Sequence, residues 1–158
     1  FWARPYHLSM DQWDSVMSTG GMASGGRFQI DYTGASKLRF NVTGHTDITM
    51  NIDGYDTQDG YKWQHFVFTK TYTPGGYHLY NHQLQWFKNG DFVSEKTRVE
   101  TRWDLLKVGL NRNSDSYWMG FIDDLRIYNR VLNHNEVGDL FDSYGCSSIG
   151  TSAHSCDE

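Results

Sequence analysis

The stretch Arg27-Phe28-Gln29-Ile30-Asp31-Tyr32 alternates polar and apolar side chains, and a turn at Thr33-Gly34 follows it. Two further runs, 37–42 and 47–52, alternate in the same way and also end at glycine turns. Apolar residues at every second position place one face of a strand against a core. Three such runs in succession therefore predict neighbouring antiparallel strands of a sandwich or barrel.

A hairpin and a helix are the clearest local signals further along the chain. Asn89-Gly90 separates the apolar run 84–88 from the run 91–93, and this dipeptide suits a type I′ turn with two positive φ angles. Asn133 followed by Glu136 resembles a capping box, and apolar residues continue at helical spacing to Tyr144. We expect one hairpin here, a last long strand over 117–128, and a single short C-terminal helix.

The composition supports an all-β chain with one domain. The 158 residues include 16 Gly, and aromatic residues make up 16% of the chain, which favours pleated structure and argues against disorder. The net charge is −5 with no basic stripe, so we expect no nucleic-acid partner. No apolar run approaches the roughly 20 residues of a membrane span, so we expect no membrane insertion. We place the domain at 1–141 and a small-residue tail at 142–158.

Two features favour an oxidising, extracellular compartment. Cys146 and Cys156 lie in the tail with nine residues between them, a spacing that suits a local disulfide better than a redox or zinc pair. Asn41-Val42-Thr43 is a sequon, which predicts N-glycosylation at Asn41. We therefore expect a secreted or cell-surface protein.

Four segments resemble one known family. Residues 63–69 are similar to the W-x-H-V-A-x-T strand of laminin-G-like domains, and residues 84–93 are similar to their L-Y-x-N-G-x-x-V hairpin. Residues 119–132 resemble the closing signature G-x-I-D-D/E-V-R-I-Y-N-R-A-L, and residues 1–5 resemble an early strand often written F-S-W-V-K-P. The chain is thus identified as resembling a laminin-G-like (pentraxin-type) domain of the concanavalin A-like lectin/glucanase superfamily.

The resemblance implies a fold and one gap in it. The expected fold is all-β, a two-sheet antiparallel jelly-roll sandwich with one short C-terminal helix. The family's first strand, which normally pairs with the closing strand, would be missing here. We expect that strand to come from an upstream segment of the same protein or from a neighbouring copy.

The sequence argues against an enzyme. Glycoside hydrolysis needs two carboxylates that face each other across a cleft. The four Glu residues form no cluster, and Glu95 and Glu100 would face opposite sides of a strand because their spacing is odd. No nucleophile elbow of the type G-x-S-x-G is present.

Calcium is the cofactor that the resemblance implies. Many members of the family hold an ion at the edge of the sandwich, partly through the acidic residue of the closing signature, and Asp123 is the position that matches. The alternative is that Asp123 and Asp124 cap a bulge or pair with Arg126 or Arg130. His65 matches the family's strand histidine, and we interpret it as structural.

A loop supplies the candidate ligand site. Asn111, Asn113 and Asp115 alternate in a loop that should lie at the rim of the sandwich, where such domains often bind ligands. The alternative is a solvated loop with no ligand. Exposed aromatic rings could also stack on sugars, and Trp86, Tyr117 and Trp118 lie near turns or rim loops.

We therefore expect a non-catalytic extracellular recognition or adhesion module. It would bind a glycan or a protein through its rim loops, with calcium as an assisting ion. The alternative is a structural assembly domain of a larger cell-surface or filament protein, in which an exposed strand edge pairs with a neighbouring segment.

Overall fold

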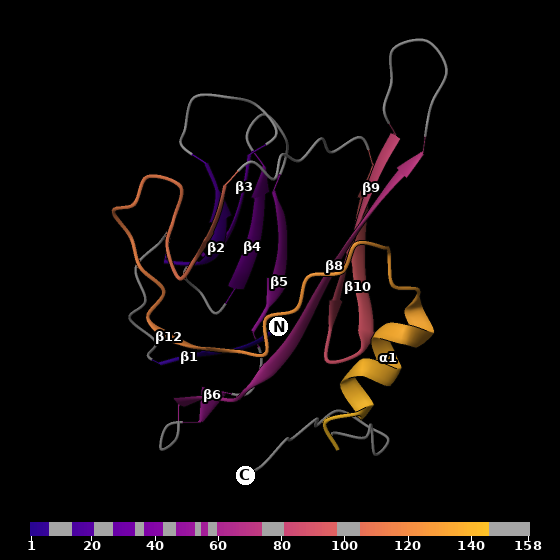
Figure 1. Cartoon of the computed structure of the whole chain (residues 1–158). Coiled ribbons are helices and arrows are strands. Elements are labelled where there is room, and N and C mark those ends of the chain that lie inside the picture. The colour runs from indigo at the N-terminus through magenta and orange to yellow at the C-terminus, as the bar shows by residue number, and fades with distance from the viewer. Residues whose placement is uncertain are drawn as a thin grey trace.

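The computed structural model describes residues 1–6, 14–20, 27–33, 37–42, 47–52, 55–56, 60–73, 81–97 and 105–145. Within these residues the chain forms two five-stranded antiparallel sheets, a two-stranded hairpin and one helix (Figure 1). The all-β sandwich with one short C-terminal helix that the sequence predicts is confirmed.

The first sheet has the strand order β10-β9-β8-β1-β12, and the second has the order β11-β2-β3-β4-β5. The strands of the first sheet are β1 (Trp2–Pro5), β8 (Gln64–Thr73), β9 (Asn81–Lys88), β10 (Asp91–Thr97) and β12 (Gly120–Asp123). Those of the second are β2 (Ser15–Thr19), β3 (Phe28–Tyr32), β4 (Lys37–Val42), β5 (Ile48–Asn51) and β11 (Leu106–Val108). The small hairpin joins β6 (Tyr55–Asp56) to β7 (Gly60–Tyr61), and the helix is α1 (His134–Asp142).

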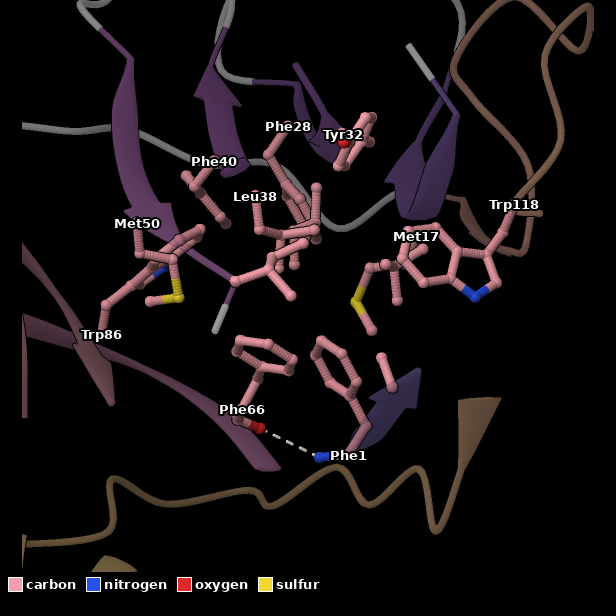
Figure 2. Packing of buried hydrophobic residues seen from close by; sticks show 14 of the residues in the cluster. Phe1, Met17, Phe28, Tyr32, Leu38, Phe40, Met50, Phe66, Trp86 and Trp118 are labelled. Atoms are coloured by element: carbon pink, nitrogen blue, oxygen red, sulfur yellow. Dashed lines mark hydrogen bonds between the residues drawn. The ribbon is translucent and has the colours of Figure 1, made fainter. Parts of the chain in front are cut away.

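The core lies between the two sheets and is rich in aromatic rings (Figure 2). Phe28 and Phe40 come from the second sheet and stack with ring centroids 5.3 Å apart. Phe66 and Phe68 come from β8 and approach them from the first sheet, and Phe68 lies 5.6 Å from Phe40. Burying one such ring stabilises the fold by roughly 1.5–3 kcal/mol, so the alternating strands are held chiefly by this layer.

The local signals for the hairpin and the helix are both confirmed. Asn89 and Gly90 have φ angles of 50° and 83°, the positive pair that a type I′ turn requires, and they join β9 to β10. Asn133 caps α1: its side chain accepts the backbone N–H of Glu136, whose carboxylate accepts the N–H of Asn133 in return. α1 buries Val137 and Phe141 against the outer face of the first sheet.

Two strands differ from the prediction. β2 was not expected from the sequence, because all five of its residues are buried and no alternation marks them. The predicted long strand over 117–128 is wrong in its extent: only Gly120–Asp123 is strand, and it pairs with β1. Asp124 has a φ of 46°, and no strand among the described residues lies beside 124–131 to pair with it. A strand persists only where a neighbour satisfies its backbone groups.

Part of the predicted tail lies outside the described residues. These include Cys146 and Cys156, so their disulfide stays a prediction. Among the described residues no helix is long and apolar enough to cross a membrane.

Candidate functional site

The outer face of the second sheet carries polar side chains that are nevertheless buried. Gln29, Asp31, Arg39 and Asn41 occupy the positions of β3 and β4 between the core residues, so they share the face opposite the core. Asp31 is 0% exposed, and Arg39 is 7% exposed. A buried charge is costly unless it is paired and hydrogen-bonded, so the partners of these groups decide what the face can do.

Asp31 is the centre of this face, and three hydrogen bonds hold its carboxylate. The guanidinium of Arg39 donates from Nε and Nη2 to the two carboxylate oxygens, at 2.8 Å each. Gln29 donates from Nε2 to Oδ2 at 2.6 Å. The paired bonds from Arg39 are the two-pronged geometry in which arginine binds carboxylates most strongly.

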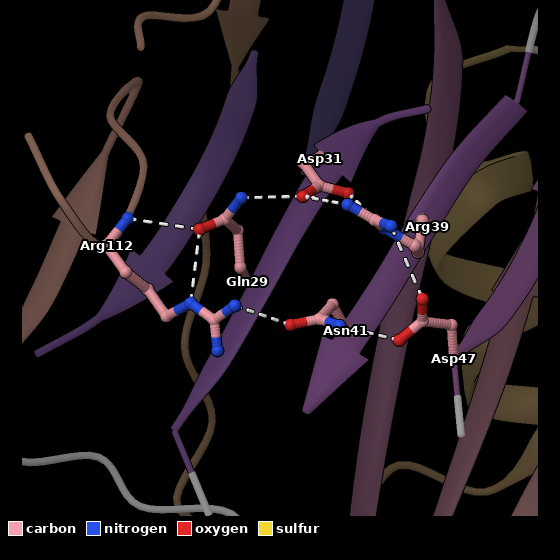
Figure 3. Close-up of polar contacts among 6 residues, drawn as sticks. All are labelled: Gln29, Asp31, Arg39, Asn41, Asp47 and Arg112. Carbon is pink, nitrogen blue, oxygen red and sulfur yellow. Dashed lines mark hydrogen bonds and ion pairs between the residues drawn. The ribbon is translucent and has the colours of Figure 1, made fainter. Parts of the chain in front are cut away.

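Arg112 and Asp47 close these contacts into a ring (Figure 3). Arg112 donates from Nε to Oε1 of Gln29 at 3.3 Å and from Nη2 to Oδ1 of Asn41 at 2.6 Å. Asn41 donates to Oδ1 of Asp47 at 2.6 Å, and Arg39 donates to its Oδ2 at 3.3 Å. We call the set Gln29, Asp31, Arg39, Asn41, Asp47 and Arg112 the polar ring.

The charges within the polar ring balance, because two carboxylates face two guanidinium groups. Burial raises the pKa of Asp31, while the hydrogen bonds and charge of Arg39 act against the rise. Burial also lowers the pKa of Arg112. The polar ring is thus a network with no net charge whose members hydrogen-bond to one another. Such a network is rigid, so it fixes the position of a loop that is bonded to it.

The loop 111–116 is attached to the polar ring through Arg112. The backbone N–H of Arg112 also donates to Gln29, at 3.1 Å. On the other side of the loop, Lys107 of β11 donates from Nζ to the carbonyl of Arg112 at 2.8 Å and to the hydroxyl of Ser114 at 2.9 Å. The second sheet therefore holds this loop from three strands, β3, β4 and β11.

The loop is also closed on itself. Asn111 is 4% exposed, and its side chain donates to Asp115 at 2.6 Å and accepts the backbone N–H of Asp115 at 3.1 Å. Of the three predicted ligand residues, Asn111 and Asp115 contact each other. Asn113 lies exposed at the tip of the loop, beside Ser114, whose φ is 65°. Their role in binding stays a prediction.

Sequence reasoning missed Arg112 although it lies inside the predicted loop. Its partners Asn41 and Gln29 are 71 and 83 residues away along the chain, so no local spacing marks the contact. One signal in the sequence could have pointed to it. Arg112 is a cation between Asn111 and Asn113, and the strands of the neighbouring sheet carry polar residues at every second position.

Asp123 lies at the end of β12 and forms no metal-binding cluster with the acidic groups that the structure describes. Its Oδ1 accepts the backbone N–H of Asp124 at 2.7 Å. The carboxylate of Asp124 pairs with Arg126 at 2.8 Å, so its charge is already compensated. Calcium prefers six to eight oxygen ligands. In the part of the chain that the structure describes, no three His, Cys, Asp or Glu side chains converge, and the residues present do not by themselves fit the ion.

His65 is buried beneath α1, among aromatic rings. Its ring centroid lies 5.1 Å from that of Trp2 and 6.1 Å from that of Phe141. Nδ1 has no hydrogen-bond partner among the described residues, and burial lowers the pKa of His65 to about 4. A neutral imidazole that stacks in this layer acts as a packing residue.

The other candidate residues are distributed over both buried and exposed positions. Trp86 is fully buried in the core, and Trp118 is 9% exposed and donates to the carbonyl of Phe121. Tyr117 is 63% exposed, so it is the one of the three aromatic candidates that could stack on a ligand. Asn41 belongs to the polar ring with both ends of its amide hydrogen-bonded, and a glycan on its nitrogen would have to be accommodated beside Asp47.

Both glutamates that the structure describes, Glu95 and Glu136, have other partners. Glu95 accepts hydrogen bonds from Gln83 and Gln85, and Glu136 caps α1. Asp31 is closed off from solvent. Glu100 and Glu158 lie outside the described residues.

Comparison with known proteins identifies the class. Residues 1–138 match the family model described as the concanavalin A-like lectin/glucanases superfamily, in its laminin G type. Since this match covers most of the chain, the protein belongs to that family.

One solved structure shares the fold. The chain is similar to the crystal structure of the binding domain of Paraclostridial Mosquitocidal Protein 1, with a TM-score of 0.50 and 21% sequence identity. The alignment covers 94% of this chain and 37% of that one, so the chain spans little more than a third of that protein's length. No curated protein matches the sequence.

Proposed function

We propose that the protein is a non-catalytic extracellular recognition module that binds a glycan or a protein through the loop 111–116. The observation that supports this most directly is the way the loop is held. Arg112 and Lys107 fix its base to the second sheet, while Asn113 and Ser114 remain exposed at its tip. A loop fixed before binding loses little conformational entropy when a partner arrives.

Membership in a lectin-type superfamily and a fold shared with a binding domain support a binding role. Fold alone does not define function, because this architecture also carries enzymes. Glu95 and Glu136 are both held by other partners, and this favours binding over catalysis.

The test is a glycan-array screen of the chain, run in calcium and again in EDTA. We expect binding that Asn113→Ala abolishes and that Asn135→Ala, a matched exposed asparagine on α1, leaves unchanged. Both variants should melt like the parent chain because neither side chain is buried. Binding that survives Asn113→Ala would place the ligand elsewhere and contradict the proposal.

Calcium enters this proposal at Asp123, the position that matches the acidic residue of the family's closing signature. Loss of binding in EDTA that Asp123→Asn reproduces would support the ion. Equal binding in both buffers would contradict it and leave the loop proposal standing.

A second candidate function is a structural assembly domain of a larger surface or filament protein. The observation that favours it is the segment 124–131 after β12, which pairs with no strand among the described residues. If no array ligand binds in either buffer, this candidate becomes the better one.

A further inference from the structure

Among the described residues of β8, β9 and β10, Glu95 is the one charged side chain on the outer face of the first sheet. This face carries the residues that alternate with the core residues Leu84 and Trp86 of β9. α1 lies against the end of the face that holds the turn between β9 and β10 (Figure 1). Beyond α1 the face is polar, and its described members are Thr69, Thr71, Gln83, Gln85, Glu95 and Thr97.

The lysines of these three strands lie on the opposite face. Lys70 and Lys96 both pair with Leu84, a core residue, and cross-strand partners share a face of the sheet. Lys88 donates from Nζ to the carbonyl of Asn51 in β5, so it also extends toward the second sheet. No described lysine or arginine of β8, β9 or β10 therefore shares the face of Glu95.

Two neutral amides hold the carboxylate of Glu95 through one of its oxygens. Gln83 donates from Nε2 to Oε2 at 2.6 Å, and Gln85 donates from Nε2 to the same oxygen at 3.2 Å. Oε1 accepts no hydrogen bond from any residue that the structure describes. The carboxylate is thus fixed in position but keeps its negative charge and an open oxygen, and a group fixed in advance loses little entropy on binding.

An exposed aromatic ring adjoins this carboxylate. Phe92 and Glu95 pair with Phe87 and Gln85, which are two positions apart in β9, so the two side chains are neighbours on one face, about 7 Å apart along the strand. Phe92 is 44% exposed, although His134 stacks on its ring with centroids 5.3 Å apart. The face therefore offers an apolar surface directly beside an anion.

We propose that Glu95 binds the ammonium group of a lysine side chain on a protein partner, and that the four-carbon stem of this lysine lies against Phe92. The charge is complementary, and lysine stems pack on apolar surface while the ammonium group stays among polar groups. We call Gln83, Gln85, Phe92 and Glu95 the lysine subsite.

The hydrogen bonds of Glu95 favour an ammonium group over a guanidinium group. Each carboxylate oxygen has two acceptor directions, and Gln83 and Gln85 occupy both directions of Oε2. A guanidinium group binds a carboxylate best with two parallel hydrogen bonds, one to each oxygen. An ammonium group is a point charge that needs only Oε1.

A second exposed apolar residue favours a protein over a small free amine. Val93, at the bulge of β10 beside Phe92, is 40% exposed. A protein surface can cover Val93 together with the lysine subsite, whereas a small amine would leave it in water. This inference is independent of the role proposed for the loop 111–116, because that loop is fixed to the second sheet.

The test is a nuclear magnetic resonance titration of the 158-residue chain with a capped Ala-Lys-Ala peptide. We expect saturating shifts of the side-chain amides of Gln83 and Gln85 and of the backbone amide of Phe92, with none in the loop 111–116. Glu95→Gln keeps the shape and removes the charge, so it should weaken binding roughly tenfold.

The matched control variant is Asp91→Asn. Asp91 is also an exposed acidic residue of β10, but it pairs with Lys88 and so lies on the other face. Asp91→Asn removes the same charge from the chain and should bind the peptide like the parent. Both variants should melt like the parent chain because both side chains are exposed.

Three further ligands sharpen the assignment. A peptide with norleucine in place of lysine keeps the stem without the ammonium group and should bind roughly tenfold more weakly. A peptide with arginine keeps the charge and should bind several-fold more weakly than the lysine peptide. Putrescine carries ammonium groups without a peptide and should also bind more weakly.

Each expectation has a result that would overturn the proposal. No shift at millimolar lysine peptide would exclude the subsite, and equal weakening by Glu95→Gln and Asp91→Asn would indicate general charge attraction. Equal binding of the norleucine peptide would indicate an apolar site. Equal or tighter binding of the arginine peptide would contradict the choice of ammonium, and equal or tighter binding of putrescine would make a small amine the ligand.

Discussion

The polar ring on the second sheet and the segment 124–131 after β12 of the first sheet differ in how completely their polar groups are paired. In the polar ring, Asp31 and Arg39 are buried and joined by two hydrogen bonds. The backbone of the segment 124–131 has no strand beside it among the described residues. A closed network holds a loop in place and supports the proposed binding role. A segment whose backbone has no strand beside it favours the assembly candidate.

The largest effect should come from breaking the polar ring at its most buried ion pair. Arg39→Met removes the cation and leaves the carboxylate of Asp31 buried beside Gln29 alone. Removing one partner of a buried pair costs about 3–5 kcal/mol of unfolding free energy. Chemical denaturation measures the loss.

The control for Arg39→Met is the ion pair of Arg126 with Asp124, in which the arginine side chain is 47% exposed. Arg126→Met should therefore cost much less stability than Arg39→Met. Equal losses in the two variants would mean that the polar ring is not the closed, buried network described above.

The second effect is a pH dependence of the free energy of unfolding, and it comes from His65, which lies between the first sheet and α1. The pKa of His65 is about 4 in the folded chain and 6.5 in the unfolded chain, so the unfolded state takes up the proton first as the pH falls. The free energy of unfolding therefore keeps its full value above pH 6.5. It falls between pH 6.5 and 4 by about 3 kcal/mol in total because of this group. Urea denaturation across this range measures the slope.

His65→Phe tests the assignment, because phenylalanine has a similar ring and cannot take up a proton. The variant should flatten the pH dependence between pH 6.5 and 4 and keep the fold at neutral pH. If the slope is unchanged in this variant, another group causes it and His65 is not the buried neutral residue inferred here.

A smaller loss of stability should follow when the loop 111–116 is detached from the second sheet. Arg112→Ala removes the side-chain bonds to Gln29 and Asn41 while the backbone bond to Gln29 can remain. Each neutral partner is worth about 1 kcal/mol, so we expect a loss of about 1–3 kcal/mol with faster hydrogen exchange at Asp115. Arg130→Ala, at an exposed arginine that pairs with Glu136, is the control and should leave exchange in the loop unchanged.

The sequence predicted those parts of the fold that depend on local patterns. Alternation predicted β3, β4 and β5, and the hairpin and the helix cap followed from Asn89-Gly90 and Asn133. These features depend on residues no more than a few positions apart, so one sequence suffices to find them. The all-β class followed from composition and from the same patterns, whereas the two-sheet jelly-roll sandwich was implied by the resemblance to laminin-G-like domains.

The candidate site was less predictable because it depends on contacts between distant residues. Alternation indicated that Gln29 and Asp31 face away from the core, but not that Arg112 would reach them from 83 residues away. The end of β12 at Asp123 was not predicted either, since the local pattern continues to Tyr128 and does not show where a neighbouring strand ends.

Native-state hydrogen exchange of the chain tests the contrast between the polar ring and the segment 124–131 most directly. We predict that the amides of Ile30 and Phe40, in the strands that carry the polar ring, exchange only on global unfolding. In the same experiment the amide of Ile127 should exchange orders of magnitude faster. Equal protection at all three positions would show that the segment 124–131 is paired and would contradict this account.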